Sequence, residues 1–550
     1  MRLSTRGSGW TGGCGGVAVA LVLAVGISAA GCGDEAIGNP TPEASHPRTG
    51  GTAVVGSISD VDSWNEYLSR QSFANSVHRR IFCRLLRESG DDRDHPYAHD
   101  PELAESWSFS EDGRAVTFRL REAVWSDGRP IRASDVRFTW QAQISPQVAW
   151  SLADAKDNIT DVEVVDDRTV TVRFDRVYPY QLEDANLGGI LPEHVHGRIP
   201  FDHWRDHDWS AVRIASGPFI LEEHRSGESI TLARNPRYFE TGLPRLDRVV
   251  FKVVPDAGNL LTQLLSGTVD YMENVPPWEA ERIRAARGLS LLAFDVPRFE
   301  YLGWNGARAP FDDPVVRRAL TMAIDREALV EELLYGFGRV SVGPVLSETW
   351  GADREIAPWP YDPRRALELL RSRGFERRGE DGLLERDGKP IELTLTTNAG
   401  NRLRESVQIK IQEQLSRIGV RVHIQPLEMR TFVHRNLAGE FDAYVGGWSV
   451  SGRVLEELFG SRSVPPQGSN VVAYRSADMD RMLAALDGAH DWRQMKPVLS
   501  VIQRRLHEDQ PYTFLYEVRG LAASGPRLQG VRIEHPLDPL AHLERAWVVR

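Results

Sequence analysis

The chain has very few cysteines. Only Cys14, Cys32 and Cys83 occur among its 550 residues, and the first two lie near the N-terminus. One thiol therefore remains for the folded body, which excludes an internal disulfide there and any fold that depends on disulfide bridges. A chain of this length can build enough hydrophobic core to fold without one.

The chain also lacks an excess of positive charge. It carries 66 Lys and Arg residues against 77 Asp and Glu residues, a formal net charge of −11. Because nucleic-acid binding depends on a basic surface, nucleic acid is excluded as the expected partner. No phosphate-binding loop or dinucleotide fingerprint occurs either. With 41% hydrophobic and 26% charged residues the composition is that of a globular protein, and 550 residues predict two or three lobes.

No apolar run is long enough to cross a bilayer, which takes about 20 residues. The run over residues 16–30 follows two arginines, a pattern that predicts an export signal over residues 1–31. Its end, Ser28–Cys32, resembles a bacterial lipobox. The resemblance implies that Cys32 is lipidated and that residues 32–50 form the anchor and a flexible tether. A plain secretory signal cut nearby is the alternative.

Strand-like and helix-like segments alternate along the body without a fixed repeat. This mixture predicts an α/β or α+β class. Period-two alternation and glycine-bounded runs predict strands at 51–56, 116–120, 391–396 and 420–424, with a hairpin over 162–174. Helical spacing predicts helices at 73–86, 260–265, 364–373 and 404–418, and one continuous helix over 314–334.

Several groups of motifs follow one another in the order found in a known family. They are Pro101–Trp107 with Asp112-Gly113, Trp125–Gly128 and Ala133–Val136; Ser216–Phe219 with Arg234–Phe239 and Leu264–Asp270; Trp304-Asn305 with Pro310–Asp313, Val316–Leu320 and Ala323–Arg326; and Tyr361–Pro363 with Ala366 and Leu369-Leu370. Together they resemble the extracytoplasmic solute-binding proteins of family 5, the oligopeptide, dipeptide and nickel type.

The resemblance implies a large α/β fold of the two-lobed periplasmic-binding-protein kind with an additional third domain (type II, cluster C-like). Lobe I is then discontinuous and takes residues 51–85, 212–295 and 515–550. Lobe II, the extra domain, takes residues 86–211, and lobe III takes residues 296–514.

The same resemblance implies the function. Family members are the substrate-binding components of ATP-binding-cassette (ABC) importers, which capture a peptide-like or other small organic solute between lobes and deliver it to the permease subunits. We therefore expect a monomer without enzymatic activity or cofactor, exported and lipid-anchored to the outer face of the cell membrane, or periplasmic. The alternative is an extracellular ligand-binding module used for sensing or assembly without transport.

The resemblance also indicates a ligand segment at 441–451. Peptide-binding relatives carry a Trp here, followed three residues later by an Asp that holds the ligand's amino group. This chain has Trp448, Ser449 and then Ser451 at the acidic position. Because a hydroxyl group cannot neutralise an ammonium group in a closed cleft, we expect ligands with a free peptide amino terminus to bind weakly.

Two further Trp-Asn pairs are candidates for ligand contact. Trp304 and Asn305 stand at the predicted crossing into lobe III, and Trp64 and Asn65 stand early in lobe I. Aromatic faces beside amide groups suit sugars or neutral organic ligands. The alternative is that these tryptophans fill the cores of the lobes.

Two other kinds of site are disfavoured. Residues 447–451 resemble a nucleophile elbow for three positions, but that motif needs a glycine where Ser451 stands. Four histidines and three aspartates between 194 and 208 are possible nickel or zinc ligands, yet their spacing fits no compact tetrahedral site. A solvated loop is the preferred interpretation, and no metal site is predicted.

Overall fold

One mixed sheet runs through the ranges of lobe I and lobe III. The computed structural model of the chain describes residues 46–88, 98–378, 382–449, 454–535 and 538–549. The order of strands in this sheet is β18-β17-β19-β12-β20-β11-β1-β10-β9-β8, and β13 pairs with β20. Parallel pairs (β1 with β10 and β11, β17 with β18 and β19) occur beside antiparallel ones, so the α/β class is confirmed.

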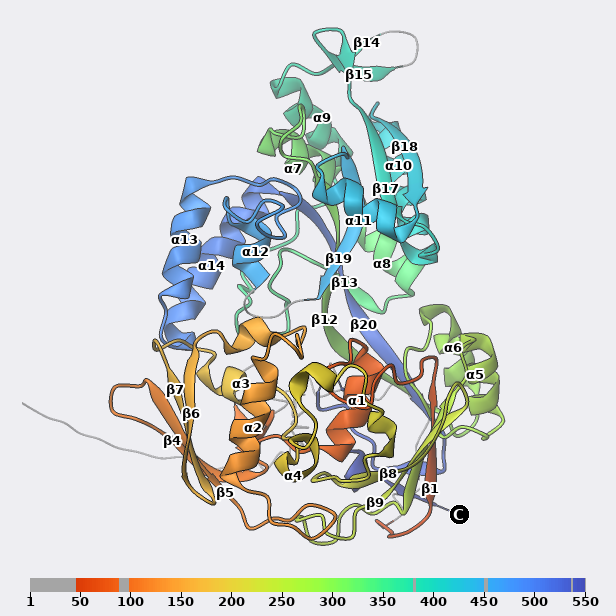
Figure 1. Cartoon of the computed structure of the whole chain (residues 1–550). Helices are drawn as coiled ribbons and strands as arrows, with labels where there is room; N and C mark the ends of the chain where they lie inside the picture. Colours follow the sequence, from red (N-terminus) through yellow and green to blue (C-terminus); the bar gives the residue numbers. More distant parts are fainter. Residues whose placement is uncertain (1–45, 89–97, 379–381, 450–453, 536–537, 550) are drawn as a thin grey trace, which may run out of the picture. The chain divides into compact units, whose positions relative to one another are not determined.

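The strands of lobe I lie at one end of this sheet, next to its helices (Figure 1). β1 (sequence TAVVGS) has no exposed residue, whereas in its parallel neighbour β10 (sequence RVVFKV) only Val249 and Phe251 are buried. The elements are β1 (Thr52–Ser57), α1 (Ser72–Ile81), β8 (Phe219–Arg225), β9 (Ser229–Arg234), β10 (Arg248–Val253), α5 (Ala257–Leu265), β11 (Tyr271–Met272), α6 (Ala280–Ala285), β21 (Leu528–Gln529) and β22 (Trp547–Val548).

Lobe II contains a separate antiparallel sheet of order β4-β5-β7-β6, against which α2 packs. Its elements are β2 (Leu86–Glu88), β3 (His99–Pro101), β4 (Ala104–Phe109), β5 (Ala115–Leu120), α2 (Ala133–Gln143), β6 (Ile159–Asp166), β7 (Thr169–Phe174), α3 (Gln181–Asn186) and α4 (Glu193–His196). One continuous hydrophobic core joins this sheet to the strands of lobe I.

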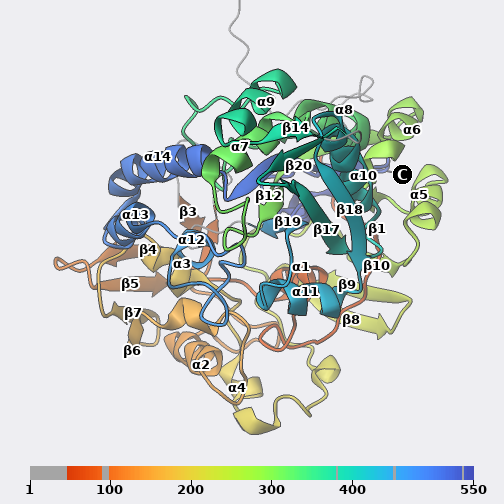
Figure 2. The ribbon, with the colours of Figure 1, turned by 90° about the horizontal axis from the view of Figure 1, so that it is seen from above.

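Lobe III holds the other end of the main sheet and most of the helices. Its elements are α7 (Pro314–Met322), α8 (Arg326–Leu334), β13 (Gly338–Val340), α9 (Pro363–Ser372), β14 (Glu376–Arg378), β15 (Leu383–Arg386), β16 (Lys389–Pro390), β17 (Glu392–Asn398), α10 (Arg402–Arg417), β18 (Arg421–Leu427), α11 (Met429–Leu437), β19 (Ala443–Ser449), α12 (Val454–Phe459), α13 (Ala477–Asp487) and α14 (Trp492–Asp509). In Figure 2, α13 and α14 lie on the opposite side of the sheet from α5 and α6.

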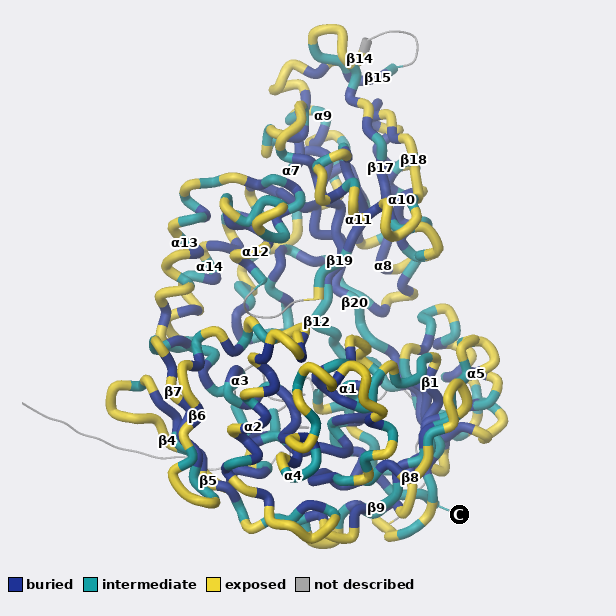
Figure 3. The backbone as a smooth tube through the Cα atoms, in the orientation of Figure 1, coloured by how far each residue is buried: buried dark blue, intermediate teal, exposed yellow. Residues whose placement is uncertain are grey.

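Two long strands carry the chain between the two ends of the sheet. β12 (Ser290–Trp304) and β20 (Tyr512–Ser524) pair antiparallel along most of their length. The predicted borders at 295/296 and 514/515 fall inside these strands. Leu515 and Tyr516, just after the predicted border, still pack into a core of lobe III. Leu521, further along the same strand, packs into a core of lobe I. Figure 3 shows that buried residues follow the strands and that exposed residues lie on the outer turns of the helices.

Most of the predicted elements are present, but two helix predictions are wrong in detail. The helix expected over 314–334 is two helices, because Asp325 leaves the helical conformation and its carboxyl group accepts the Ala328 N–H as a new N-cap. The helix expected to reach residue 86 ends at Ile81, since Phe82 is extended. Helices that start at an Asp-Pro pair follow the sequence closely, as α7 and α9 do.

Candidate ligand-binding site

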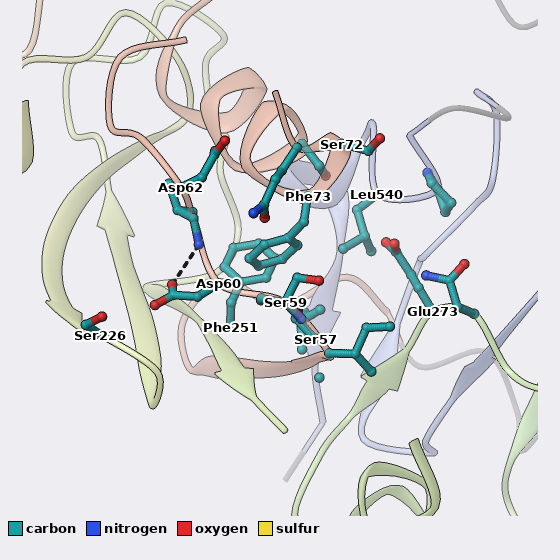
Figure 4. A pocket seen from close by; sticks show the side chains of 18 residues that line it. Ser57, Ser59, Asp60, Asp62, Ser72, Phe73, Ser226, Phe251, Glu273 and Leu540 are labelled. Atoms are coloured by element: carbon teal, nitrogen blue, oxygen red, sulfur yellow. Dashed lines mark hydrogen bonds between the residues drawn. The ribbon is translucent and has the colours of Figure 1, made fainter. Parts of the chain in front are cut away.

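A cavity of about 740 Å³ lies at the carboxyl end of β1. Its walls come from the connection between β1 and α1, the first turn of α1, β10, the residues after β11, and a segment near the C-terminus (Figure 4). Hydroxyl, amide and carboxyl groups stand there beside the rings of Phe73 and Phe251, whose centroids are 5.6 Å apart. Small-molecule sites have this mixture of apolar surface and a few polar groups.

A chain of hydrogen bonds fixes the loop that follows β1. Asp60 accepts hydrogen bonds from the N–H groups of Val61 (2.7 Å) and Gly227 (2.8 Å), and it contacts His224 Nε2 at 3.0 Å. Trp64 Nε1 donates to the other ring nitrogen of His224 at 3.1 Å. Partial burial alone would raise the pKa of Asp60, but these backbone and histidine contacts lower it below its ordinary value. Asp60 is therefore an ionised anchor of the loop.

The predicted pair Trp64 and Asn65 supports this cavity and does not line it. The indole N–H of Trp64 donates its hydrogen bond to His224, as described above. Asn65 is completely buried, and its Oδ1 accepts the Tyr67 N–H at 3.0 Å. The neighbouring Asp62, which does line the cavity, accepts hydrogen bonds from Ser69 Oγ (2.6 Å) and the Arg70 N–H (3.0 Å).

Glu273 is the exception among the carboxyl groups of the cavity. Within the described residues it receives no hydrogen bond and forms no ion pair. Its burial and the negative charge of Asp538 raise its pKa, the positive charge of Arg80 offsets this in part, and the resulting pKa is about 7. Sequence reasoning missed this residue, because nothing in its neighbourhood along the chain shows which groups surround it.

The second group of candidates lies on β19 in lobe III. Trp448 pairs with Phe299 across β12 and β19, and Ser449 pairs with Arg298. The Trp448 side chain is half-buried against a lobe III core, and Ser449 is exposed. Both remain candidates for ligand contact. Ser451 lies outside the described residues, so the expectation attached to it stays a prediction.

Trp304 and Asn305 both lie in the interior of lobe III. Trp304 is completely buried, stacks on Phe311 at 5.2 Å and donates from Nε1 to Thr513 Oγ1 at 3.0 Å. Asn305 is buried, and its side-chain amide donates to the carbonyl oxygens of Gly439 (3.1 Å) and Phe441 (2.8 Å). Both side chains are used inside the lobe, which favours the alternative that this pair belongs to the core.

A buried charge cluster stands beside Trp448. Glu300 accepts hydrogen bonds from Arg404 Nε at 2.8 Å and from Arg298 Nε at 2.8 Å. A Cβ atom on Gly447, the residue before Trp448, would lie 2.3 Å from a Glu300 carboxyl oxygen. A side chain at this position would therefore displace the Glu300 carboxyl group from its present place against the strand. Linear sequence did not reveal this cluster, since Arg404 stands 104 residues after Glu300.

The histidine segment does not converge on a metal site. His194 contacts Asp127 at 2.9 Å, whereas His196 is buried and stacks on Trp209 at 4.7 Å, where burial lowers its pKa to about 3. Over the described ranges, no group of three or more His, Cys, Asp or Glu residues is arranged to hold a metal ion. In the same part of the chain, no helix is long and apolar enough to cross a membrane.

Comparison with known proteins identifies the family of this chain. Residues 99–458 match the family model of the bacterial extracellular solute-binding proteins, family 5. The oligopeptide-binding protein AppA of Bacillus subtilis is 30% identical over 97% of this chain and 98% of its own length. The chain belongs to family 5. A di/tripeptide-binding protein of Pseudomonas aeruginosa is 28% identical over 79% of this chain and 84% of its own length.

The fold agrees with that assignment. The structure of Bacillus subtilis AppA in complex with a nonapeptide superposes with a TM-score of 0.72 and 30% identity, over 92% of this chain and all of that one. The expected family and its large multi-domain binding-protein fold are thus confirmed. Family 5 proteins are extracytoplasmic substrate-binding components of ABC importers rather than enzymes, and this solute-binding protein shares that function.

Proposed function

We propose that this family 5 protein is lipid-anchored and captures a peptide or peptide-like molecule between lobes I and III for an ABC permease. The observation that carries the proposal is the cavity at the carboxyl end of β1, which is lined by residues of the lobe I ranges and would form the lobe I wall of the site. Its volume of about 740 Å³ lies within the range of about 300–1,000 Å³ usual for small-ligand sites. Peptides offer N–H and C=O groups that suit its hydroxyl, amide and carboxyl groups. The ligands for which these relatives are named, or with which they were solved, are an oligopeptide, a nonapeptide and di- or tripeptides, and they support the same class.

The crossing strands provide the place where the lobes would close on the ligand. The register of β12 against β20 shifts between Asp295 and Phe299, so residues 296–298 have no partner in β20. A bulge of this kind weakens the ladder locally and concentrates bending there. We take it as the hinge of the proposed three-lobe division, with lobe I on one side and lobe III on the other.

Calorimetry of the purified mature protein with a library of tripeptides tests the ligand class. We expect saturable binding with a negative heat-capacity change, because closure buries apolar surface around the ligand. If no tripeptide or longer peptide produces a saturable heat while a different small solute does, the proposed ligand class is wrong.

The anchor is tested by Cys32→Ala in the full-length chain. We expect the variant to leave the membrane fraction and appear in the soluble exported fraction, because the acylated residue is lost. Cys14→Ala is the matched control, since that cysteine precedes the predicted cut, and it should sediment with membranes as the unmodified protein does. Unchanged membrane sedimentation of Cys32→Ala contradicts the anchor.

A further inference from the structure

The carboxyl groups around the ligand cavity differ in how they are compensated. Asp60 and Asp62 are held by the hydrogen bonds described above. Asp538, on the C-terminal segment, is buried and receives two hydrogen bonds from Arg80 of α1, at 2.6 and 2.7 Å. Within the described residues, Glu273 alone of these four has neither a hydrogen bond nor an ion pair.

Among the residues that the structure describes, no positive group is free to neutralise Glu273. Arg80 is the positive group whose field reaches it, but both terminal nitrogens of that guanidinium are committed to Asp538. Asp538 itself repels the Glu273 carboxylate, and the adjacent Tyr271 is buried with a hydroxyl that makes no hydrogen bond within the described residues. The fold thus keeps, at a cavity wall, a carboxyl group whose ionised form is disfavoured.

The rest of the cavity suits a positively charged group. Figure 4 shows Glu273 beside Leu540, with Phe73 and Phe251 between it and Asp60 in this view; Ser72 lines the same cavity. An ammonium group has three N–H donors: a carboxylate takes one and neutralises the charge, and hydroxyl oxygens such as that of Ser72 take the others. The two rings offer apolar contact to the carbon atoms that carry the group.

We propose that Glu273 is the cation subsite of the ligand cavity and that its carboxylate pairs with an ammonium group of the bound peptide. This inference rests on the proposed function and adds to it the charge of the substrate. It is an alternative to the prediction, drawn from Ser451, that peptides with a free amino terminus bind weakly, and the experiment below distinguishes the two. In this proposal the carboxylate that neutralises the ammonium group is Glu273 of lobe I, rather than an acid in the lobe III segment 441–451.

The test compares Glu273→Gln with the unmodified protein by calorimetry at pH 7.5, using three probes. The probes are a tripeptide library with free amino termini, the same library N-acetylated, and an N-acetylated library with a central lysine. Glu111→Gln is the matched control, because it removes the same charge from the exposed turn between β4 and β5. Glutamine keeps the shape of the side chain and loses only the charge.

We expect the unmodified protein and Glu111→Gln to bind free-amino peptides about tenfold or more tightly than acetylated ones, since a neutralised buried charge is worth at least that much. Glu273→Gln should lose this preference. If the acetylated peptides with a central lysine bind as tightly as the free-amino peptides, the preferred group is a side-chain ammonium. If they bind as weakly as the other acetylated peptides, the preferred group is the amino terminus. Either result supports the subsite. An amino-group preference that survives in Glu273→Gln, or equal binding of both libraries by the unmodified protein, overturns the inference alone. Failure of every library to bind the unmodified protein contradicts the proposed function as well.

The dependence on pH gives a readout that a structural role would not produce. Because the pKa of Glu273 is about 7 in the unliganded protein, affinity for free-amino peptides should rise about tenfold between pH 5.5 and 7.5 as the carboxyl group ionises, and a proton should be released on binding. Glu273→Gln should show no such rise. A pH-independent affinity of the unmodified protein contradicts the subsite.

Stability provides a check that the variant is folded. A carboxyl group whose pKa is raised from 4.5 to about 7 stabilises the fold fully at low pH and loses that contribution as pH rises through about 7. Glu273→Gln, which cannot ionise, should therefore melt at pH 8 no lower than the unliganded unmodified protein. A markedly lower melting temperature would mean that Glu273 supports the fold, and would overturn the inference.

Discussion

Replacing Arg80 with Met is expected to lower the apparent free energy of unfolding by about 3–5 kcal/mol, because it leaves Asp538 as an uncompensated buried charge. Both side chains are almost fully buried, and their two hydrogen bonds of 2.6 and 2.7 Å join α1 to a segment 458 residues later. Burial alone would raise the pKa of Asp538, but the charge and hydrogen bonds of Arg80 lower it to about 2. Urea unfolding at pH 7 measures the effect.

The double variant Arg80→Met with Asp538→Asn is the control for that result. It removes both charges, so it should recover a substantial part of the loss. Arg248→Met breaks an exposed pair with Glu222 and should leave the free energy of unfolding almost unchanged, because solvent screens such a pair. Since the pKa of Asp538 is depressed, the stabilisation is present above pH 3.8 and is lost as pH falls through about 2. An Arg80→Met cost as small as that of Arg248→Met contradicts this account.

Trp304→Ala is expected to destabilise the protein by about 3–5 kcal/mol, the usual cost of emptying a large buried aromatic site. The change removes the stacking on Phe311 and leaves Thr513 without its indole donor. The milder Trp304→Phe should lower stability but leave ligand affinity within about twofold, because this side chain does not reach the ligand cavity.

Trp448→Phe is the matched comparison. Trp448 is half-buried near the carboxyl end of β19, so its replacement should cost little stability. If Trp448 contacts the ligand, the replacement should weaken ligand binding about three- to tenfold. Thermal unfolding and calorimetry on both variants separate the two roles. A larger loss of affinity in Trp304→Phe than in Trp448→Phe contradicts the assignment of Trp304 to the core.

Local signals in the sequence predicted the elements well where a few neighbouring residues determine them. The Asp-Pro starts of α7 and α9 and the glycine after α5 are of this kind. The break between α7 and α8 was missed, because the apolar spacing continues across it while Asp325 acts through a cap. Caps of this type interrupt a helix without interrupting its hydrophobic pattern.

The site was harder to predict because its residues meet only in the folded chain. Trp304 and Trp448 stand on paired neighbouring strands, and nothing local to either shows that one is completely buried and the other half-buried. The surroundings of Glu273 come from α1 and from Asp538 near the C-terminus. Burial and unmet charge are properties of the assembled fold, so motif order identified the family while leaving Glu273 unnoticed.

Native mass spectrometry of the protein, purified from the exporting cell without unfolding, tests the central claim most directly. The account predicts a second species, heavier than the free chain by the mass of one small molecule, which disappears under denaturing conditions and fragments into amino-acid residues. A spectrum that contains only the free chain, or a bound molecule whose fragments hold no amino-acid residues, would contradict the claim that this protein captures peptides.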